Sequence, residues 1–400
     1  MQVRYDIFPV NVDTPGAVEK IMKEIGVWPE GISIMAPKGK FFTLKVGPLK
    51  PQAAHILKQE MLSKGGEAAL KGSILCGDDS TYALLMGTWS QFQKVIPKLK
   101  QQPFGLKDLG EELETALEYL LDTRKVWKIS CREKELVVGR KTLIMGILNV
   151  TPDSFSDGGL YNNPEAALKR ALEMEEQGAD IIDVGAESTR PGFDPVPEEE
   201  EISRLMPVLK KLVGRVKVPI SVDTYKSRVA RLALELGADI INDVSGLSDP
   251  HMAETAAEYN APVIIMHSVP ENTENILEGV IRTLRKKKEL AEEKGIKRES
   301  IILDPGIGFA KDTRQNLELI NGLDALKVLG QPILLGVSRK SVIGNVLKLP
   351  PGERLEGTAA AVTVGIVRGA DIVRVHDVKE MVRVVRMTDA LLGKGEGDGW

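Results

Sequence analysis

The sequence predicts an α/β fold in which a closed (β/α)8 barrel, a TIM barrel, spans residues 129–400 and follows a small α+β domain over residues 1–128. Three observations predict the barrel. From Thr142 onward, eight short β-branched runs alternate with eight amphipathic helical stretches. The runs are continuously apolar, which is typical of parallel strands covered by helices. A Gly-Ala-Asp repeat joins a helix end to the next strand at 178–180, 237–239 and 369–371.

The eight predicted strands follow one another along the chain, and each leads into a helical stretch that returns to the start of the next. The strands are 142–150, 179–186, 218–224, 238–245, 262–268, 300–308, 332–339 and 370–378. Apolar residues at three- and four-residue spacing predict helices between them, for example over 165–178, 227–237 and 357–369. An open doubly wound sheet would also alternate strands and helices, but eight units in about 250 residues favour a closed barrel.

The first third of the chain lacks the regular alternation of strands and helices. Its mixture of strand-like and helical stretches predicts a small α+β domain of unknown role. Strands are expected over 4–12, 40–47 and 82–89, and helices over 51–72 and 109–123, the last bridging to the barrel. Residues 128–139 are typical of a hairpin and are expected to close the bottom of the barrel. The glycine-rich tail from about residue 393 is expected to fray.

Composition excludes several classes of protein. The chain has 53 lysines and arginines against 57 acidic residues, and a formal charge of −4 argues against nucleic acid as a partner. No leader pattern and no apolar stretch long enough for a membrane span are present, so a cytoplasmic protein with no membrane partner is expected. Cys76 and Cys131 are expected to be ordinary reduced thiols.

Polar residues stand at the carboxyl end of every predicted barrel strand. In a closed parallel barrel these ends meet at one face, where active sites of this fold are built. A lone polar residue at such a position is usually a capping group, but eight polar strand ends together indicate a site. They are Asn149, Glu187 to Arg190, Asp223, Asn242 with Asp243, Met266 with His267, Asp304, Ser338 to Lys340, and Arg374 with His376.

These residues divide into two chemical sets. Asp223, Asn242 and Asp304 offer oxygens to a flat heterocycle that presents several N–H donors, such as a 2-amino-4-oxopteridine. The cationic set, which suits a departing diphosphate, consists of Lys340, Arg374, His376 and Arg190. Asn149 is a candidate ligand of Mg²⁺, although a hydrogen bond at the strand end explains it almost as well. Two long loops, 151–166 and 187–201, are expected to cover this site.

The same residues fall in ordered motifs that resemble those of the dihydropteroate synthases. The motifs are MGILNVTPDSFSDGG (145–159), DVGAESTRPG (183–192), SVDTYK (221–226), INDVSG (241–246), DPGIGFAK (304–311), GVSRKS (336–341) and RVHDV (374–378). The resemblance covers the whole barrel and implies a magnesium-using transferase of folate biosynthesis that is a target of sulfonamides. Its substrates would be 6-hydroxymethyl-7,8-dihydropterin diphosphate and 4-aminobenzoate, which are joined with release of diphosphate.

The resemblance also implies a role for each matching residue. Those that would hold the pterin are Asp223, Asn242, Asp304 and Lys340. Those that would contact the diphosphate are Arg374, His376 and Thr189, with Asn149 on Mg²⁺ and with Asp157 and Arg190 in the two loops. Those that would border the aminobenzoate are Thr189, Pro191, Phe309, Ser338 and Lys340. The implied catalytic set is Lys340, Arg374, His376, Asp157 and Arg190.

Two departures and two other functions remain open at this point. His267 to Pro270 replace a stretch that the family commonly continues with Met-Gln-Gly, and Ile307 stands where many members have an aromatic residue. A pterin-dependent methyltransferase that passes a methyl group to a corrinoid protein shares the ring-binding set but has no anion to release. A catalytically idle barrel that serves as a scaffold would be expected to lose the charged strand ends. Barrels of this type are often dimers through their later helices, and by analogy a homodimer is among the expectations.

Overall fold

The chain forms two compact units, Met1–Thr123 and Arg124–Trp400, in a computed structural model. The structure describes residues 7–10, 12, 16–72, 80–121, 125–150, 164–187, 196–271 and 273–395. Within these residues, no helix combines the length and the apolar character that crossing a membrane requires.

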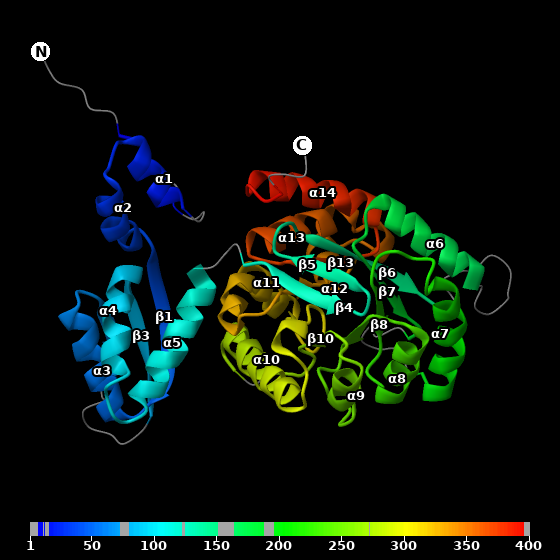
Figure 1. The fold of residues 1–400 in the computed structure, drawn as a ribbon, viewed down its shortest axis with the longest axis horizontal. Helices are drawn as coiled ribbons and strands as arrows, with labels where there is room; N and C mark the ends of the chain where they lie inside the picture. Colours follow the sequence, from blue (N-terminus) through cyan, green and yellow to red (C-terminus); the bar gives the residue numbers. More distant parts are fainter. Residues whose placement is uncertain are drawn as a thin grey trace, which may run out of the picture. The chain divides into compact units, whose positions relative to one another are not determined.

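The first unit is a three-stranded antiparallel sheet with helices, in the strand order β1-β3-β2 (Figure 1). Its elements are α1 (Ala17–Glu24), α2 (Pro29–Met35), β1 (Phe41–Leu49), α3 (Pro51–Ser63), β2 (Glu67–Leu70), β3 (Thr81–Thr88), α4 (Trp89–Leu99) and α5 (Leu106–Leu121). One face of the sheet buries Phe42 and Leu85 against apolar side chains of the helices, among them Leu57 and Phe92. The unit therefore has its own hydrophobic core, as an independent module requires.

Two expectations for this unit were wrong in part. The predicted helix over 51–72 ends at Ser63, and residues 67–70 form strand β2, which pairs with β3. The predicted strand over 4–12 is absent from residues 7–10 and 12, the part of it that the structure describes. The other predicted strands and the helix that ends near residue 121 are confirmed.

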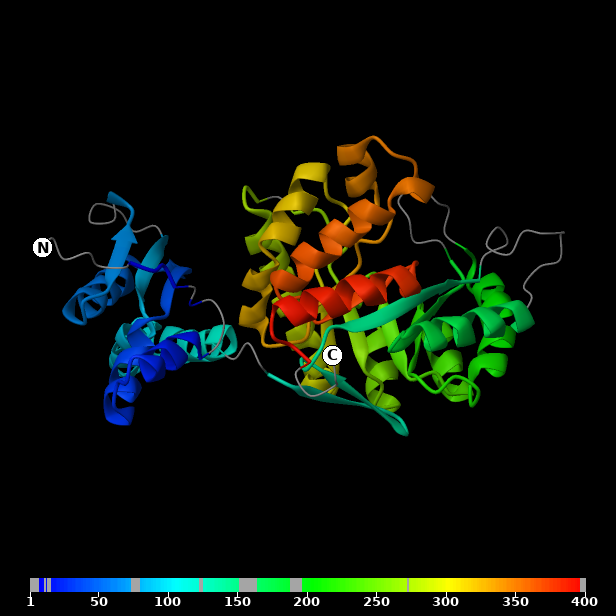
Figure 2. The same cartoon turned by 90° about the horizontal axis from the view of Figure 1, so that it is seen from above.

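The second unit is an eight-stranded parallel barrel surrounded by helices, as Figures 1 and 2 show, and the predicted fold class is confirmed. Its strands are β6 (Leu143–Asn149), β7 (Ile181–Gly185), β8 (Ile220–Asp223), β9 (Ile240–Asp243), β10 (Val263–Met266), β11 (Ile301–Asp304), β12 (Leu334–Leu335) and β13 (Ile372–Val375). A parallel bridge between Leu303 and Ile333 connects β11 to the residue before β12 and completes the ring.

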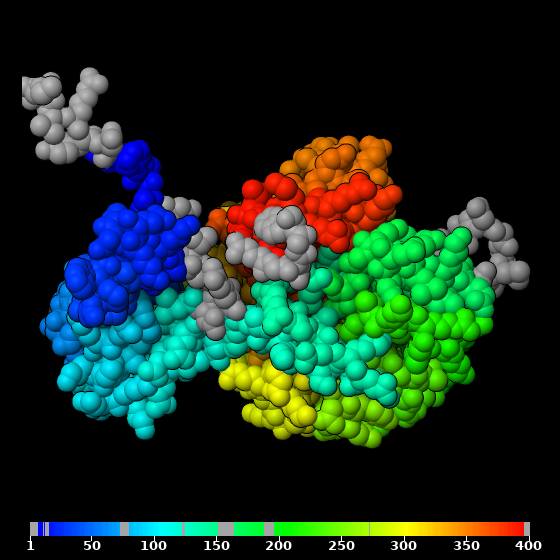
Figure 3. Space-filling view, turned by 45° about the horizontal axis from the view of Figure 1, so that its top comes forward, coloured from blue at the N-terminus to red at the C-terminus, as the bar shows by residue number. Residues whose placement is uncertain are grey.

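Helices follow the strands and cover the outside of the barrel. They are α6 (Pro164–Gln177), α7 (Glu198–Leu212), α8 (Ser227–Leu236), α9 (Met252–Glu258), α10 (Ile276–Glu293), α11 (Thr313–Asn321), α12 (Ser341–Leu347), α13 (Leu355–Val367) and α14 (Val378–Leu391). Figure 3 shows α14, in red, at the surface of this unit, beside the orange residues that precede it in the sequence. The buried apolar faces of strands and helices form one continuous core, which fixes the strand ends in space.

The predicted hairpin consists of β4 (Trp127–Cys131) and β5 (Lys134–Val138). Its buried residues, such as Ile129 and Val138, pack against residues at the starts of barrel strands, for example Leu143 and Ile372. The hairpin therefore closes the amino-terminal end of the barrel, as predicted. Burial raises the pKa of the Cys131 thiol to about 12, so this thiol stays protonated.

The Gly-Ala-Asp repeat has a structural role at the same end of the barrel. Its glycines have φ angles of 102°, 113° and 96°, in the left-handed region that favours glycine after a helix. Each aspartate accepts a hydrogen bond from a backbone N–H at or next to the start of the preceding strand: Ile144 to Asp180, Ile220 to Asp239 and Ile333 to Asp371. The repeat thus joins neighbouring strands at the end opposite the predicted site.

Candidate active site

The carboxyl ends of the barrel strands bring those predicted site residues that the structure describes to one face. Because the strands are parallel and neighbours in one ring, their last residues lie at the same end. Asn149, Asp223 and Asp304 are the final residues of β6, β8 and β11, and Arg374 lies in β13. All are buried or half-buried.

The guanidinium of Arg374 joins both predicted sets in one network. Its Nε donates to Asp183 Oδ2 at 2.6 Å, and its Nη2 donates to Asp223 Oδ2 at 2.7 Å. Asn242 Nδ2 donates to the same oxygen of Asp183 at 3.1 Å. The residues predicted to hold a ring and the arginine predicted to hold an anion therefore lie in direct contact in the barrel mouth.

Asp183 is the residue of this network that sequence reasoning missed. It lies inside β7, its side chain is fully buried, and it is a charged residue in an otherwise apolar strand. That contrast was a usable signal, because a buried carboxylate needs a partner. One oxygen of Asp183 and one of Asp223 are buried and have no hydrogen-bond partner within the described residues.

A second group lies between β11 and β12. Asp304 accepts a hydrogen bond from the Gly306 backbone N–H at 2.7 Å. The Lys340 ammonium donates to the Ile307 carbonyl and lies 4.6 Å from the centre of the Phe309 ring. A Cβ added at Gly336 would lie 3.7 Å from Lys340 Nζ and 3.8 Å from Asp304 Oδ2. Glycine at this position therefore leaves open the space between the two charged groups.

Ser338 and His376 connect the ends of β12 and β13. His376 donates its backbone N–H to Ser338 Oγ at 3.2 Å, and its Nδ1 lies 3.0 Å from the same oxygen. The ring orientation of His376 is thereby fixed beside Arg374, two residues earlier in the chain. The part of His376 in holding an anion stays a prediction.

Burial shifts the pKa values of Asp223, Asp304 and Lys340 toward neutrality, whereas the neighbouring carboxylates raise the pKa of Arg374. Desolvation raises the pKa of Asp223 to about 7, although Arg374 opposes the shift. Desolvation lowers the pKa of Lys340 to about 8, although Asp304 opposes it, and raises the pKa of Asp304 against the effect of Lys340. Such groups change protonation state at low cost when a ligand arrives, which is typical of active sites.

The two departures from the family pattern lie beside this group. His267 is buried, and its Nε2 lies 2.9 Å from Glu271 Oε1. Ser268 donates to the Ser245 carbonyl at 3.2 Å, and Ile307 is fully buried in the core. His267 and Ser268 therefore have hydrogen-bond partners of their own in this stretch.

Four predicted site residues lie outside the described residues: Asp157, Thr189, Arg190 and Pro191. Most of the two long loops and Cys76 also lie outside them. In the described part of the chain, no three His, Cys, Asp or Glu side chains converge as metal ligands. Asn149 is half-buried at the carboxyl end of β6, where its amide offers one oxygen, a donor of the kind that Mg²⁺ accepts together with water and phosphate oxygens.

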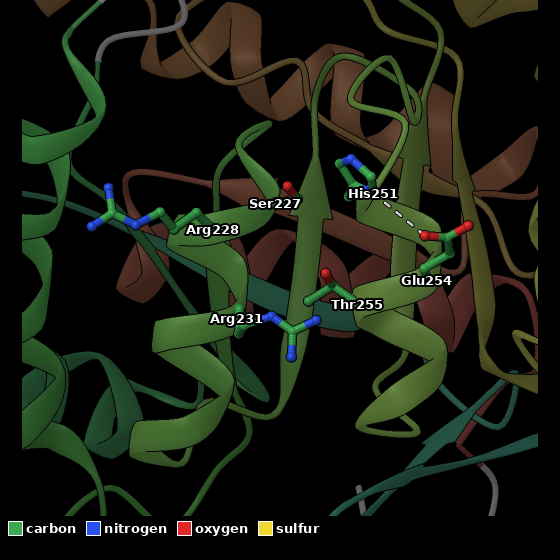
Figure 4. Close-up of a pocket in the computed structure, with 6 residues that line it drawn as sticks. All are labelled: Ser227, Arg228, Arg231, His251, Glu254 and Thr255. Carbon is green, nitrogen blue, oxygen red and sulfur yellow. Dashed lines mark hydrogen bonds and ion pairs between the residues drawn. The ribbon is translucent and has the colours of Figure 1, made fainter.

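A separate groove of about 260 Å³ lies between α8 and α9 (Figure 4). It is lined by Ser227, Arg228, Arg231, His251, Glu254 and Thr255, none of which belongs to the predicted site. Both of its arginines already pair with glutamates, Arg228 with Glu198 and Glu199, and Arg231 with Glu258. This groove on the outside of the barrel is therefore not the candidate site.

Comparison with known proteins agrees with this geometry. Residues 145–376 match the family of pterin-binding enzymes. The chain is 51% identical to the dihydropteroate synthase of Bacillus subtilis over 280 residues, which cover 70% of this chain and 98% of that protein. A solved structure of the Xanthomonas albilineans dihydropteroate synthase with 4-aminobenzoic acid is 40% identical, with a TM-score of 0.64, and the match covers 67% of this chain and 98% of that one.

A third relative also includes the first unit. The chain is 41% identical over 388 residues to a probable bifunctional folylpolyglutamate synthase/dihydropteroate synthase of Halobacterium salinarum. The match covers 95% of this chain but 46% of that protein, so the chain spans less than half of its length. Because 388 residues exceed the second unit, this relative shares the first unit as well.

Proposed function

The chain belongs to the pterin-binding enzymes and, among them, to the dihydropteroate synthases, and on that premise we propose a role for each group in the barrel mouth. As a transferase of folate biosynthesis, it joins 6-hydroxymethyl-7,8-dihydropterin diphosphate to 4-aminobenzoate and releases diphosphate. The observation that supports the roles best is the contact of Arg374 with Asp223 and Asp183, because it brings a ring-binding acid and an anion-binding cation together at one end of the barrel.

The pterin is held by the acidic and amide side chains. Asp304 and Asp223 accept hydrogen bonds from the amino-pyrimidine edge and other N–H groups of the ring, and Asn242 adds an amide. Lys340 lies over the Phe309 ring and beside Asp304, and contacts the pterin from that side. Asp183 holds Arg374 and Asn242 in position through one oxygen.

The diphosphate is held by the cations of the β13 end. Arg374 and His376, with Thr189, contact its oxygens, and Asn149 would hold Mg²⁺ through its amide oxygen. Bound Mg²⁺ would supply positive charge to the departing diphosphate. The carbon–oxygen bond breaks as these groups neutralise the leaving anion, and the aryl amine attacks the exocyclic carbon. The reaction requires no activated protein nucleophile. The residues that border the aminobenzoate are Phe309, Ser338 and Pro191.

The direct test of the function is aminobenzoate-dependent release of diphosphate. The purified full chain, incubated with the dihydropterin diphosphate and Mg²⁺, is expected to release diphosphate only when 4-aminobenzoate is added, with stoichiometric dihydropteroate. Turnover without a corrinoid acceptor also separates this activity from methyl transfer. Absence of aminobenzoate-dependent release from a folded chain would contradict the function.

The raised pKa of Asp223 predicts that pterin binding is coupled to the release of a proton. Its pKa of about 7 lies above the ordinary carboxyl value, so the group is largely protonated at pH 6 in the free site. A ligand that donates N–H groups favours the ionised form, so binding at pH 6 should release a proton and be weaker than at pH 7.5, where the Lys340 ammonium, with a pKa of about 8, is still mostly charged. Calorimetry in buffers of different ionisation enthalpy measures the released protons. Asp223→Asn should abolish the release at pH 6, and equal proton counts at both values would contradict the assignment.

A homodimer through the last helices is the assembly we propose. Helix α13 carries apolar residues on all sides, and Val364 and Val367 are exposed on its outer face. Met387 and Leu391 of the neighbouring helix α14 are also exposed. A helix that is apolar all round is usually covered on both sides. Sedimentation analysis of the full chain, with Val367→Asp as the disrupting variant, distinguishes a dimer from a monomer.

A further inference from the structure

The turn after β12 contains one residue in a strained backbone conformation. Arg339, between Ser338 and Lys340, has a φ angle of 57°, in the left-handed region. This region is unfavourable for a residue with a Cβ atom, and such residues persist only where the surrounding structure holds them. The Arg339 side chain pairs with Asp377, which follows β13. The backbone of the turn needs anchors of its own.

The backbone N–H and carbonyl of Arg339 are both bonded to residues at the start of α13. The N–H donates to Thr358 Oγ1 at 3.1 Å, and the carbonyl accepts from Arg354 Nη1 at 2.9 Å. Thr358 is fully buried, and its hydroxyl donates to the Arg354 carbonyl at 2.8 Å. The side chain of Arg354 is itself fixed, because its Nε donates to the Leu349 carbonyl at 3.0 Å. Arg354 thus connects the turn after β12 to the start of α13.

Helix α12 leaves room for the Arg354 guanidinium at Gly344. A Cβ added at Gly344 would lie 2.1 Å from Arg354 Nη2, 2.3 Å from its Cζ and 2.6 Å from its Nε. Non-bonded atoms do not approach one another this closely, so glycine is needed for the guanidinium to lie against the backbone of the helix. Glycine also makes a helix less stable than alanine does. The close approach of Arg354 therefore accounts for glycine at this buried position.

We propose that Arg354 is a positioning residue for pterin binding, because it holds the strained turn that presents Lys340 to the site. This inference rests on the proposed function, in which Lys340 contacts the pterin. The Arg339 carbonyl that Arg354 bonds belongs to the peptide group that joins Arg339 to Lys340. Without the guanidinium, this peptide loses a partner and can rotate, which displaces the Lys340 side chain. Binding groups need to be held within about 0.5 Å of their productive positions, so a small displacement is sufficient to weaken binding.

Arg354→Ala tests the inference through the affinity for the dihydropterin diphosphate. Its Kd, measured by calorimetry without 4-aminobenzoate and well below the unfolding temperature of the variant, should rise by about tenfold or more. A charge-assisted hydrogen bond contributes about that factor or more. Arg354→Lys keeps a donor for the Arg339 carbonyl and should recover part of the affinity.

Arg368→Ala is the matched control. Arg368 follows the other end of α13, and its Nη2 donates to Asn321 Oδ1 at 3.0 Å on the exposed surface. Exposed polar contacts contribute little, so this variant should keep the wild-type Kd. An equal rise of the Kd in Arg368→Ala would assign the effect to general loosening of α13 and overturn the inference.

A double-mutant cycle tests whether Arg354 acts through Lys340. Lys340→Ala alone should weaken binding of the dihydropterin diphosphate. It leaves no ammonium to position, so adding Arg354→Ala to it should raise the Kd by less than about twofold further. Equal fold-changes from Arg354→Ala in both backgrounds would mean that Arg354 supports the site independently of Lys340, which would overturn the inference.

Gly344→Ala removes the anchor while it keeps the arginine, and it also serves if Arg354→Ala folds poorly. The added methyl group overlaps with the end of a flexible side chain, so the guanidinium should move and α12 should remain. The Kd should rise as in Arg354→Ala. In the Arg354→Ala background the same glycine substitution should change the Kd by less than about twofold, because no guanidinium is left to displace. Additive effects would show that the two residues act separately and would contradict the proposed anchor.

Amide hydrogen exchange tests the anchor without any substrate. Residues 338–343 should exchange faster in Arg354→Ala and in Gly344→Ala than in the wild type and in Arg368→Ala. Unchanged exchange in both variants would overturn the inference. A failure of the proposed function is distinguishable, because it appears as an unchanged Kd in Lys340→Ala. A failure of the inference alone appears as a raised Kd in Lys340→Ala beside an unchanged Kd in Arg354→Ala.

Discussion

Arg374→Ala is expected to lower kcat for dihydropteroate formation by about 100- to 1000-fold, the range found when one donor to a developing anion is removed. Within the described residues, Arg374 uses its Nε and Nη2 to bond Asp183 and Asp223. Its remaining N–H groups are left for the diphosphate. Because that charge develops as the carbon–oxygen bond breaks, the loss should fall on kcat more than on KM for aminobenzoate. Steady-state kinetics with both substrates varied measures this split.

The same substitution makes a second, independent prediction about stability. Removing the guanidinium leaves Asp183 and Asp223 buried without a cation, and breaking a buried pair costs about 3–5 kcal/mol. Burial already raises the pKa of Asp223 against the effect of Arg374, so loss of the guanidinium should raise this pKa further, and a raised carboxyl pKa gives stability that is present at low pH and lost as pH rises. The unfolding free energy of the variant should therefore fall further below wild type at pH 8 than at pH 6.

Two comparison variants identify the cause of the lost turnover. Arg374→Lys keeps the positive charge but lacks the guanidinium that bonds two carboxylates at once. Its kcat should therefore lie between those of Arg374→Ala and the wild type. Arg231→Ala removes an exposed arginine that pairs with Glu258 outside the barrel, and should leave kcat unchanged. A folded Arg374→Ala enzyme with near-normal kcat would remove Arg374 from the leaving-group role.

The barrel was predictable because its signals are local and repeated. Each strand is a continuous apolar run, and each polar strand end, such as Asp223 or Asp304, follows such a run directly. The first unit was harder. Residues 67–70 consist of good helix formers, and they form a strand because β3 pairs with them, with Glu67 opposite Met86. Tertiary pairing overrode local propensity there, and the two glycines before the strand were the only sequence signal of a break.

The network of the site was less predictable than its members. Arg374 and Asp183 are 191 positions apart in the sequence, so nothing local connects them. The sequence analysis assigned Arg374 and Asp223 to different parts of the substrate. It therefore did not predict that their side chains contact each other. Their pairing follows from the closure of the barrel, which brings β13 near β7 and β8 across the mouth.

Asp304→Asn is expected to weaken pterin binding by about 1.5–3 kcal/mol for each charge-assisted hydrogen bond lost, roughly 10- to 150-fold. Asp304 is buried, and among the residues that the structure describes its hydrogen bond is the one that Oδ1 accepts from the Gly306 N–H. An asparagine can keep that bond through its amide oxygen, so the turn after β11 should remain intact. Its NH2 group, however, would face the N–H donors of the ring. The loss should therefore appear in the pterin Kd measured by calorimetry.

Asp312→Asn separates this effect from a general change in the loop. Asp312 is an exposed carboxylate in the same loop, where it caps α11 by accepting from the Gln315 N–H at 2.7 Å. Asparagine is as good a cap as aspartate, so the control should keep both stability and pterin affinity. Lys340 also loses its charge partner in Asp304→Asn, so its pKa should fall further below its usual value, because burial then acts with less opposition. A pterin Kd that is equal in Asp304→Asn and Asp312→Asn would show that Asp304 does not hold the ring.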